Sequence, residues 1–362
     1  MRPIHRRRLL QALLGGGVSA ARAEDVHEHI RRLANEAPLK MKFQGSTPGE
    51  CRAWQSLFGE KLKELIGAYR PPAEWESEVE ETVELGDHRR ESLMLRAAGL
   101  PELPVYVLRP KVSGGGQRPG ILALHGHGPF GHDAVVGIDS TPERAGNIEA
   151  ANYDFGLQLV RLGYVVVAPC FTPFGRRLDL PEAYNGNDAC AVAFVRMQLL
   201  GRNLMSENLR DALWALELLA RQSAVDSDRI GCVGLSYGGR MTMLAAAVEP
   251  RIRVAVISGA LNVMQERIGL RYSCGAQVIP GLLEFGDVPE IAGLIAPRPA
   301  LWEVGQRDGL MVKDWIPEAW ERILRVYRVL GAEEQLLQDS FDGAHRWNGA
   351  KSTPLLASIL KP

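Results

Sequence analysis

Long apolar runs are missing from this 362-residue sequence: beyond residue 23, no stretch of 18 or more apolar residues occurs. A membrane-spanning helix needs about 20 such residues in a row, so we expect no membrane span in the mature chain. An excess of charge is missing too, because 42 Lys and Arg residues balance 43 Asp and Glu residues and leave a formal net charge of −1. Neither nucleic acid nor an acidic membrane surface is therefore expected as a partner.

Cysteine is scarce and scattered, with five residues at Cys51, Cys170, Cys190, Cys232 and Cys274 and no C-x-x-C pair. An odd count argues against a full disulfide framework, and the spacing matches no zinc motif. The composition, 46% apolar and 23% charged, is that of an ordinary globular protein. A chain of this length buries a core without a metal or a disulfide, so we predict buried or inert thiols, no metal and no cofactor.

The first 23 residues differ from the rest of the chain. The stretch HRRRLLQALLGGGVSAARA combines an arginine cluster, a short apolar segment rich in Leu, Gly and Ala, and the tripeptide A-R-A. These are the three parts of an export signal, and the doubled arginine followed by two leucines resembles a twin-arginine signal. We expect an exported protein, periplasmic or extracellular, cleaved after Ala23. The alternative is a frayed basic start on a cytoplasmic protein.

Residues 24–75 have a helical pattern. Apolar residues recur at steps of three and four over 26–37 and 51–69, and Pro71 and Pro72 end the region. We expect a helical extension that packs on the main domain. A separate small helical domain is the alternative, but so few residues would form a poor core alone.

From residue 76 onward, strand patterns alternate with helix patterns. Short continuous apolar runs are typical of strands buried on both faces of a parallel sheet. Their alternation with helices predicts a doubly wound, mostly parallel α/β sheet with helices on both faces, over residues 76–362. The expected antiparallel strands are 78–85, 91–97 and 103–110; the apolar runs are 120–126, 164–170, 230–236, 253–260 and 300–306; the helices are 152–163, 208–222, 238–249 and 318–331.

Two segments interrupt this alternation, at residues 170–203 and 261–290. Each follows the carboxyl end of a predicted parallel strand, which is where ligands bind in such sheets. We expect these insertions to form a lid or the walls of a substrate pocket.

The stretch GLSYGGR, residues 234–240, lies between a buried strand and a helix. A G-x-S-x-G sequence at a strand-to-helix turn is a nucleophile elbow, which raises the serine hydroxyl above the sheet. Ser236 is then the candidate nucleophile, and Gly234 and Gly238 keep the sharp turn free of clashes. The N–H of Tyr237 would face the same space and stabilise an oxyanion. The alternative is a glycine-rich turn that happens to contain a serine.

A serine nucleophile needs a base and an acid to orient the base, and in this kind of sheet they follow in the order Ser, acid, His. His345 is the only histidine after residue 132, and it follows a last short strand. Asp308 stands in a G-x-x-D loop just past another predicted strand, which favours it as the acid. The other downstream aspartates considered are Asp287, Asp314, Asp339 and Asp342.

The strand at 120–126 ends in the sequence H-G-H-G. The loop after this strand normally supplies the second backbone N–H of an oxyanion hole, which we assign to His127, with Gly126 allowing the close turn. The alternative is a metal cluster of His125, His127 and His132.

Taken in order, LALHGHG, GLSYGGR, VGQRDGL and GAHRW resemble the α/β-hydrolase superfamily, in its branch of dienelactone hydrolase-like and acetyl xylan esterase-like serine hydrolases. The resemblance covers roughly residues 80–355. It implies Ser236 as nucleophile, Asp308 as acid, His345 as base, and the N–H groups of His127 and Tyr237 as the oxyanion hole. Dienelactone hydrolases proper carry cysteine at the nucleophile position, so the serine favours ester hydrolysis over lactone chemistry.

The function predicted from these residues is hydrolysis of carboxylic esters through an acyl-enzyme, on a small-molecule or carbohydrate ester such as an acetyl ester. A serine peptidase of the prolyl oligopeptidase type is the first alternative, because S-Y-G-G resembles that group as well. Those enzymes usually carry a β-propeller, and too few residues precede the first strands to form one. A non-catalytic binding protein is less favoured because all three triad residues are present. Nothing in the sequence indicates an oligomeric state.

Three tryptophans, Trp302, Trp315 and Trp347, stand near the expected acid and base in sequence. They are candidates for a platform under sugar rings, although large aromatic side chains more often serve core packing. Arg240, on the helix after the elbow, could meet an acidic substrate. A solvated helix residue or an ion-pair partner is the more common role for such an arginine.

Overall fold

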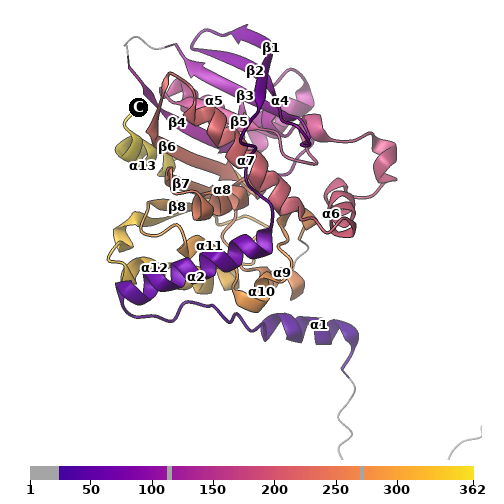
Figure 1. Cartoon of the computed structure of the whole chain (residues 1–362), viewed down its shortest axis with the longest axis vertical. Coiled ribbons are helices and arrows are strands. Elements are labelled where there is room, and N and C mark those ends of the chain that lie inside the picture. The colour runs from indigo at the N-terminus through magenta and orange to yellow at the C-terminus, as the bar shows by residue number, and fades with distance from the viewer. Residues whose placement is uncertain (1–23, 112–115, 270–272) are drawn as a thin grey trace, which may run out of the picture.

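One sheet runs through the molecule, and within the described ranges it has nine strands in the order β1-β2-β3-β5-β4-β6-β7-β8-β9 (Figure 1). The computed structural model describes residues 24–111, 116–269 and 273–362, so the expected export signal lies outside the described residues. The strands are β1 (Glu76–Glu84), β2 (His88–Arg96), β3 (Leu103–Pro110), β4 (Arg118–Leu124), β5 (Val165–Pro169), β6 (Val225–Leu235), β7 (Ile252–Ser258), β8 (Ala300–Gly305) and β9 (Leu336–Phe341).

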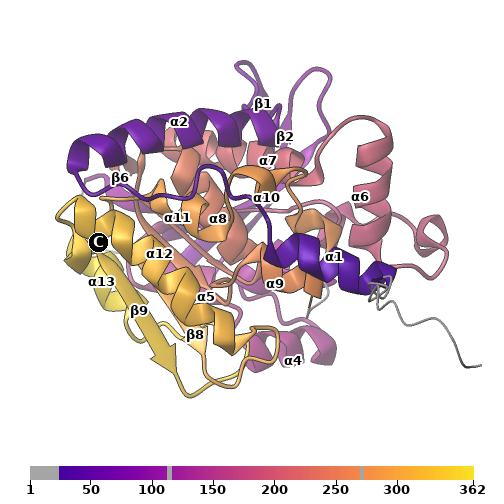
Figure 2. The same cartoon turned by 90° about the horizontal axis from the view of Figure 1, so that it is seen from below.

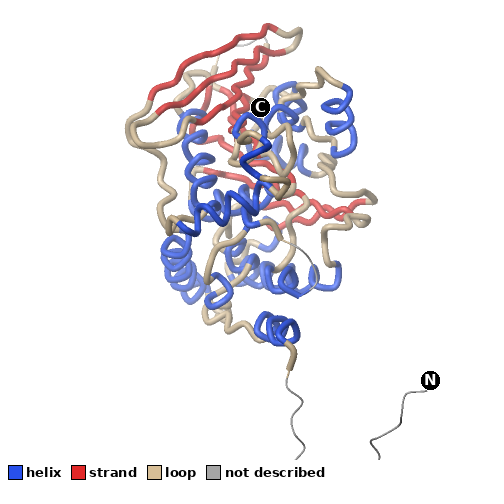
Figure 3. The backbone as a smooth tube through the Cα atoms, turned by 90° about the vertical axis from the view of Figure 1, so that its right-hand side faces the viewer, coloured by secondary structure: helices blue, strands red, loops and turns tan. Residues whose placement is uncertain are grey.

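The sheet has an antiparallel and a parallel part. Strands β1, β2 and β3 pair antiparallel with one another, and β3 pairs antiparallel with β5. From β5 through β4, β6, β7 and β8 to β9, every pairing is parallel. Each predicted strand is present, and the predicted mostly parallel α/β sheet is confirmed. The antiparallel strands extend to the end of the molecule opposite helix α1 (Figures 1 and 3).

Helices cover both faces of the parallel strands, because these strands are apolar on both sides. In β4, Leu122 and Leu124 face one core, whereas Ile121 and Ala123 face the other. The first core is covered by α2 (Pro48–Ile66), α7 (Leu204–Ala220), α8 (Tyr237–Val248), α11 (Val288–Gly293) and α12 (Ile316–Val329). The second is covered by α3 (His132–Val135), α5 (Phe155–Arg161) and α13 (Ser352–Leu360). Within the described ranges, none of the helices is both long and apolar enough to cross a membrane.

The N-terminal region contains two helices of different character. Helix α2 begins with a capping box between Thr47 and Glu50, and it buries four residues on its inner face. It packs against α8, α11 and α12, and Figure 2 shows it along the edge of the molecule, above α11 and α8. Helix α1 (Val26–Asn35) is largely exposed and buries only Ala34, whose carbonyl accepts a hydrogen bond from the Gln265 side chain. The residues that α2 buries are Cys51, Phe58, Leu62 and Ile66.

The two insertions contain short elements that periodicity did not reveal. The first holds the 3₁₀ turns η1 (Gly175–Arg177) and η2 (Pro181–Tyr184) and the helix α6 (Ala189–Leu199). The second holds α9 (Met264–Gly269), η3 (Gly275–Gln277) and α10 (Leu282–Phe285). They meet where α6 packs on η3: a Cβ on Gly275 would lie 2.3 Å from the Cβ of Phe194. The remaining described elements are α4 (Pro142–Ala151), η4 (Lys313–Trp315) and η5 (Glu333–Gln335).

Candidate active site

Ser236 is the single residue that connects the end of β6 to the start of α8. Its backbone has φ 62° and ψ −120°, a conformation that a residue with a Cβ rarely adopts. Its N–H donates to the Ser258 carbonyl at 2.8 Å, and its own carbonyl accepts from the Arg240 N–H at 3.0 Å, the first bond of the helix. The strain is held by the strand on one side and the helix on the other, as in a nucleophile elbow.

The glycines predicted for this turn stand where the backbone leaves no room for a side chain. A Cβ on Gly238 would lie 1.8 Å from the carbonyl oxygen of Leu124, and one on Gly234 would lie 2.3 Å from the carbonyl oxygen of Gly238. A Cβ on Gly126 would lie 2.9 Å from the Cβ of Ser236. These contacts press the end of β4 against the elbow, so the loop after β4 lies directly beside the serine.

His345 and Asp308 come together, although they lie on different loops. Nδ1 of His345 is 2.6 Å from Oδ2 of Asp308, and the Asp308 side chain is 1% exposed. The other carboxylate oxygen, Oδ1, accepts the Leu310 N–H at 2.8 Å, which fixes the plane of the carboxylate. An acceptor at Nδ1 keeps the hydrogen on that nitrogen and leaves Nε2 free to act as a base. Of the five aspartates considered, Asp308 is therefore the one paired with this histidine.

Ser236 and His345 both lie beside the end of β7. Ser258, which ends β7, accepts the Ser236 N–H, and the next residue, Gly259, lies against the imidazole. A Cβ on Gly259, whose φ is 60°, would lie 2.7 Å from Cε1 of His345. Nε2 of His345 is buried and has no hydrogen-bond partner among the described residues. The nitrogen remote from Asp308 is thus available to a hydroxyl.

Glu303, a fully buried residue of β8, is a part of the site that the sequence did not reveal. Its carboxylate accepts the N–H groups of Asn348 and Gly349 at 3.0 and 2.9 Å and the Ser352 hydroxyl at 2.7 Å. Burial raises the pKa of Glu303, and the three donors oppose that rise. The carboxylate therefore anchors the segment that follows His345. The one signal in the sequence that could have indicated this role is a single Glu within the apolar run at 300–306.

Replacing Glu303 with alanine is expected to lower the free energy of unfolding by about 2–4 kcal/mol, because one buried and two half-buried donors lose their acceptor. Chemical denaturation of the purified variant measures this loss. Glu303→Gln, which retains one acceptor oxygen, should lie between the variant and the parent. Glu81→Ala, at an exposed position of β1, is the matched control and should change the stability by less than about 0.5 kcal/mol. Equal stability of the Glu303→Ala variant and the parent would contradict the anchoring role.

Of the three histidines suspected of forming a metal cluster, His125 has both ring nitrogens engaged in hydrogen bonds. Phe171 N–H donates to Nε2 of His125 at 2.8 Å, so Nδ1 carries the hydrogen and donates to the Gly126 carbonyl at 2.7 Å. Burial lowers the pKa of His125 to about 4, which keeps the ring neutral. His132 is buried beside the ring of Tyr106, 4.5 Å away. His125 thus ties the loop after β4 to the end of β5 and has no nitrogen left for a metal.

The two N–H groups assigned to an oxyanion hole are both unengaged. Among the hydrogen bonds of the described residues, none uses the backbone N–H of His127 or of Tyr237. Tyr237 begins α8, where such N–H groups carry partial positive charge. Its hydroxyl accepts from the Asn208 side chain at 2.7 Å, which holds the ring against His127, 5.3 Å away.

The aromatic and basic candidates near the site have structural roles. Trp302 and Trp347 are 0% and 1% exposed, so they belong to the core and present no face to a sugar. Trp315 is half-buried and packs against the edge of the first core, the one covered by α2, α7, α8, α11 and α12. Arg240 is buried, and its guanidinium donates to Oδ1 of Asn262 at 2.5 Å. The expectation of a solvated arginine is wrong, because the second insertion covers this part of α8.

Comparison with known proteins identifies the family of this chain. Residues 197–265, which include Ser236, match the model of the prolyl oligopeptidase family. A Bacillus subtilis (strain 168) protein named "Putative hydrolase YtaP" is 30% identical over 258 residues, which cover 67% of this chain and 78% of that protein. The chain belongs to the α/β-hydrolase superfamily. The family resemblance expected from the four sequence segments is thereby confirmed.

Solved structures share the fold of this α/β-hydrolase at low sequence identity. A "putative acetyl xylan esterase" from Bacteroides fragilis NCTC 9343 has a TM-score of 0.73 and 19% identity, over 90% of this chain and 84% of that one. A glucuronoyl esterase from Solibacter usitatus has a TM-score of 0.62 and 14% identity, over 90% of this chain and 96% of that one. At such identities the similarity shows the fold.

Proposed function

We propose that this α/β-hydrolase is a serine esterase in which Ser236, His345 and Asp308 form the catalytic triad. The observation that carries the proposal is the 2.6 Å contact between His345 and Asp308, beside a strained serine, with Nε2 of the imidazole buried and unpartnered. Such a nitrogen near a strained serine is suited to remove the proton of the hydroxyl.

The reaction would proceed in two halves. Ser236 Oγ attacks the ester carbonyl while His345 takes its proton, and the N–H groups of His127 and Tyr237 stabilise the oxyanion. His345 then protonates the departing alcohol, and an acyl-enzyme remains. A water molecule, deprotonated by His345, cleaves the acyl-enzyme and restores the serine. Asp308 holds the imidazole in the required tautomer throughout.

Esters of carbohydrates are the substrate class that the fold relatives favour. The solved structures with this fold include proteins named acetyl xylan and glucuronoyl esterases. An export signal at residues 1–23 would place the enzyme where plant polysaccharide esters occur. The insertions at 170–203 and 261–290 would form the walls of the substrate pocket or a lid. A pocket of about 420 Å³ lies within the second insertion, and its lining includes neither Ser236 nor His345.

A serine peptidase of the prolyl oligopeptidase type is the second candidate, favoured by the family match at 197–265. That match covers the elbow and its surroundings, which peptidases and esterases share. Against a peptidase stands the N-terminal extension, where the structure has two helices at residues 24–75. We therefore propose an esterase with a helical extension at 24–75 and a catalytic domain at 76–362.

The two functions are separated by assaying the purified chain on p-nitrophenyl acetate, p-nitrophenyl butyrate and a peptide p-nitroanilide. We expect turnover of the esters, faster for acetate, and none of the anilide. Release of acetate from acetylated xylan then tests the carbohydrate class. Cleavage of the anilide at a rate comparable with the esters would replace the esterase by the peptidase.

A further inference from the structure

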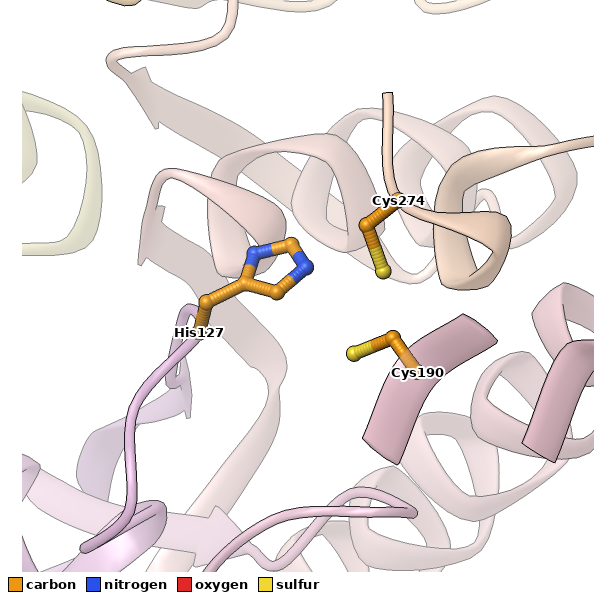
Figure 4. Close-up of side chains that lie close together, drawn as sticks. All are labelled: His127, Cys190 and Cys274. Atoms are coloured by element: carbon orange, nitrogen blue, oxygen red, sulfur yellow. The ribbon is translucent and has the colours of Figure 1, made fainter. Parts of the chain in front are cut away.

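Three side chains that could ligate a metal converge beside the candidate active site. They belong to His127 on the loop after β4, Cys190 on α6 and Cys274 immediately before η3 (Figure 4). One ligand atom from each lies within 4.8 Å of the other two, and Figure 4 shows all three side chains directed toward a common centre. Both cysteines are buried, at 3% and 6% exposure.

The tertiary fold alone creates this cluster, because the three residues come from separate segments of the sequence. Gly275 lets η3 approach α6 so closely that a Cβ there would lie 2.3 Å from the Cβ of Phe194. This packing brings Cys274 beside Cys190. His127 reaches the pair from the other side, with its ring 5.2 Å from Phe174 and 5.3 Å from Tyr237.

The cluster has the chemistry of a metal site rather than of inert core thiols. The Cys274 sulfur lies within 4.8 Å of the Cys190 sulfur and of an imidazole nitrogen of His127. The Ala276 N–H also donates to this sulfur at 3.3 Å, as outer hydrogen bonds do for metal-bound thiolates. Nε2 of His127 is buried and has no hydrogen-bond partner among the described residues. Cysteine sulfurs and an unpartnered imidazole nitrogen are the ligand atoms that structural and catalytic zinc sites use.

We propose that His127, Cys190 and Cys274 bind one zinc ion, with the fourth position left for water. Two thiolates and an imidazole suit Zn²⁺, with Zn–S near 2.3 Å and Zn–N near 2.0 Å. Tetrahedral ligands at those lengths lie about 3.5–3.8 Å apart, so small side-chain rotations close the cluster around the ion. The site joins both insertions to the loop after β4. Zinc binding here would replace the expectation from sequence of inert thiols and no metal.

The zinc site is tested by metal uptake, which needs no substrate and is independent of the esterase assay. The reduced, chelator-treated full chain is loaded with Zn²⁺, dialysed, and analysed for metal content. We expect one zinc per chain. Loading with Co²⁺ instead should give the thiolate-to-cobalt charge-transfer absorption of a site with sulfur ligands. The variants Cys190→Ala and Cys274→Ala should each weaken zinc affinity by at least about 100-fold and abolish that absorption.

Cys51→Ala is the matched control, because Cys51 is a fully buried cysteine of α2 outside the cluster. This variant should retain one zinc per chain, and circular dichroism should show that all the variants are folded. His127→Ala should lose zinc while both cysteines remain. Failure of the reduced parent to take up zinc at micromolar concentration would overturn the proposal. Full uptake by both the Cys190→Ala and Cys274→Ala variants would also overturn it.

Discussion

Replacing Ser236 with alanine is expected to lower kcat for p-nitrophenyl acetate by about 10⁴- to 10⁶-fold. The substitution removes the oxygen that would form the acyl-enzyme, and the oxyanion donors and bound water can recover only a small part of the rate. Stopped assays at high enzyme concentration measure the residual turnover. The protein should remain folded, because Ser236 makes its hydrogen bonds in the structure through backbone atoms.

Variants of the other two proposed triad residues test whether hydrolysis depends on the triad as a whole. His345→Ala and Asp308→Asn should each lower kcat by about 10⁴-fold or more, and combining either with Ser236→Ala should add little, because the three residues act as a unit. Ser358→Ala, on the exposed face of α13, is the matched serine control and should retain full activity. Ester turnover that survives Ser236→Ala would refute the nucleophile assignment.

Replacing Gly238 with alanine is expected to lower the free energy of unfolding by about 4 kcal/mol or more. The added Cβ would lie 1.8 Å from the carbonyl oxygen of Leu124, and the contacted atom is backbone in a central strand. To remove this clash, β4 and α8 must move apart, and that movement breaks the packing under the elbow. Thermal and chemical denaturation measure the loss, and the folded fraction should have little esterase activity.

Gly59→Ala is the control for this prediction. Gly59 lies inside α2, and a Cβ there meets nothing within 4 Å. Because alanine favours helix over glycine by about 0.5–1 kcal/mol, this variant should be slightly more stable than the parent. If Gly238→Ala were as stable as the parent, the close packing of β4 on the elbow would be wrong.

The order of strands and helices along the chain could be predicted because each element has its own local pattern. The run YVVVAPC at 164–170 is apolar throughout, and it forms β5 at Val165–Pro169, with apolar packing on both faces. The elbow glycines and Asp308 after β8 were found in the same way, because chain order and position after a strand restrict the choices. Helix α6 escaped prediction because it lies in an insertion, where it shows little amphipathic contrast.

The sequence by itself determined the class of fold, the strands, and the candidate serine, histidine and aspartate, since these depend on local periodicity and order along the chain. Only the tertiary structure decided which residues meet. It buried Arg240, placed Glu303 under the segment after His345, tied both ring nitrogens of His125 into hydrogen bonds, and gathered one histidine with two distant cysteines. The physical reason is that such contacts form between segments far apart in sequence, where backbone packing sets the distances and no local pattern records them.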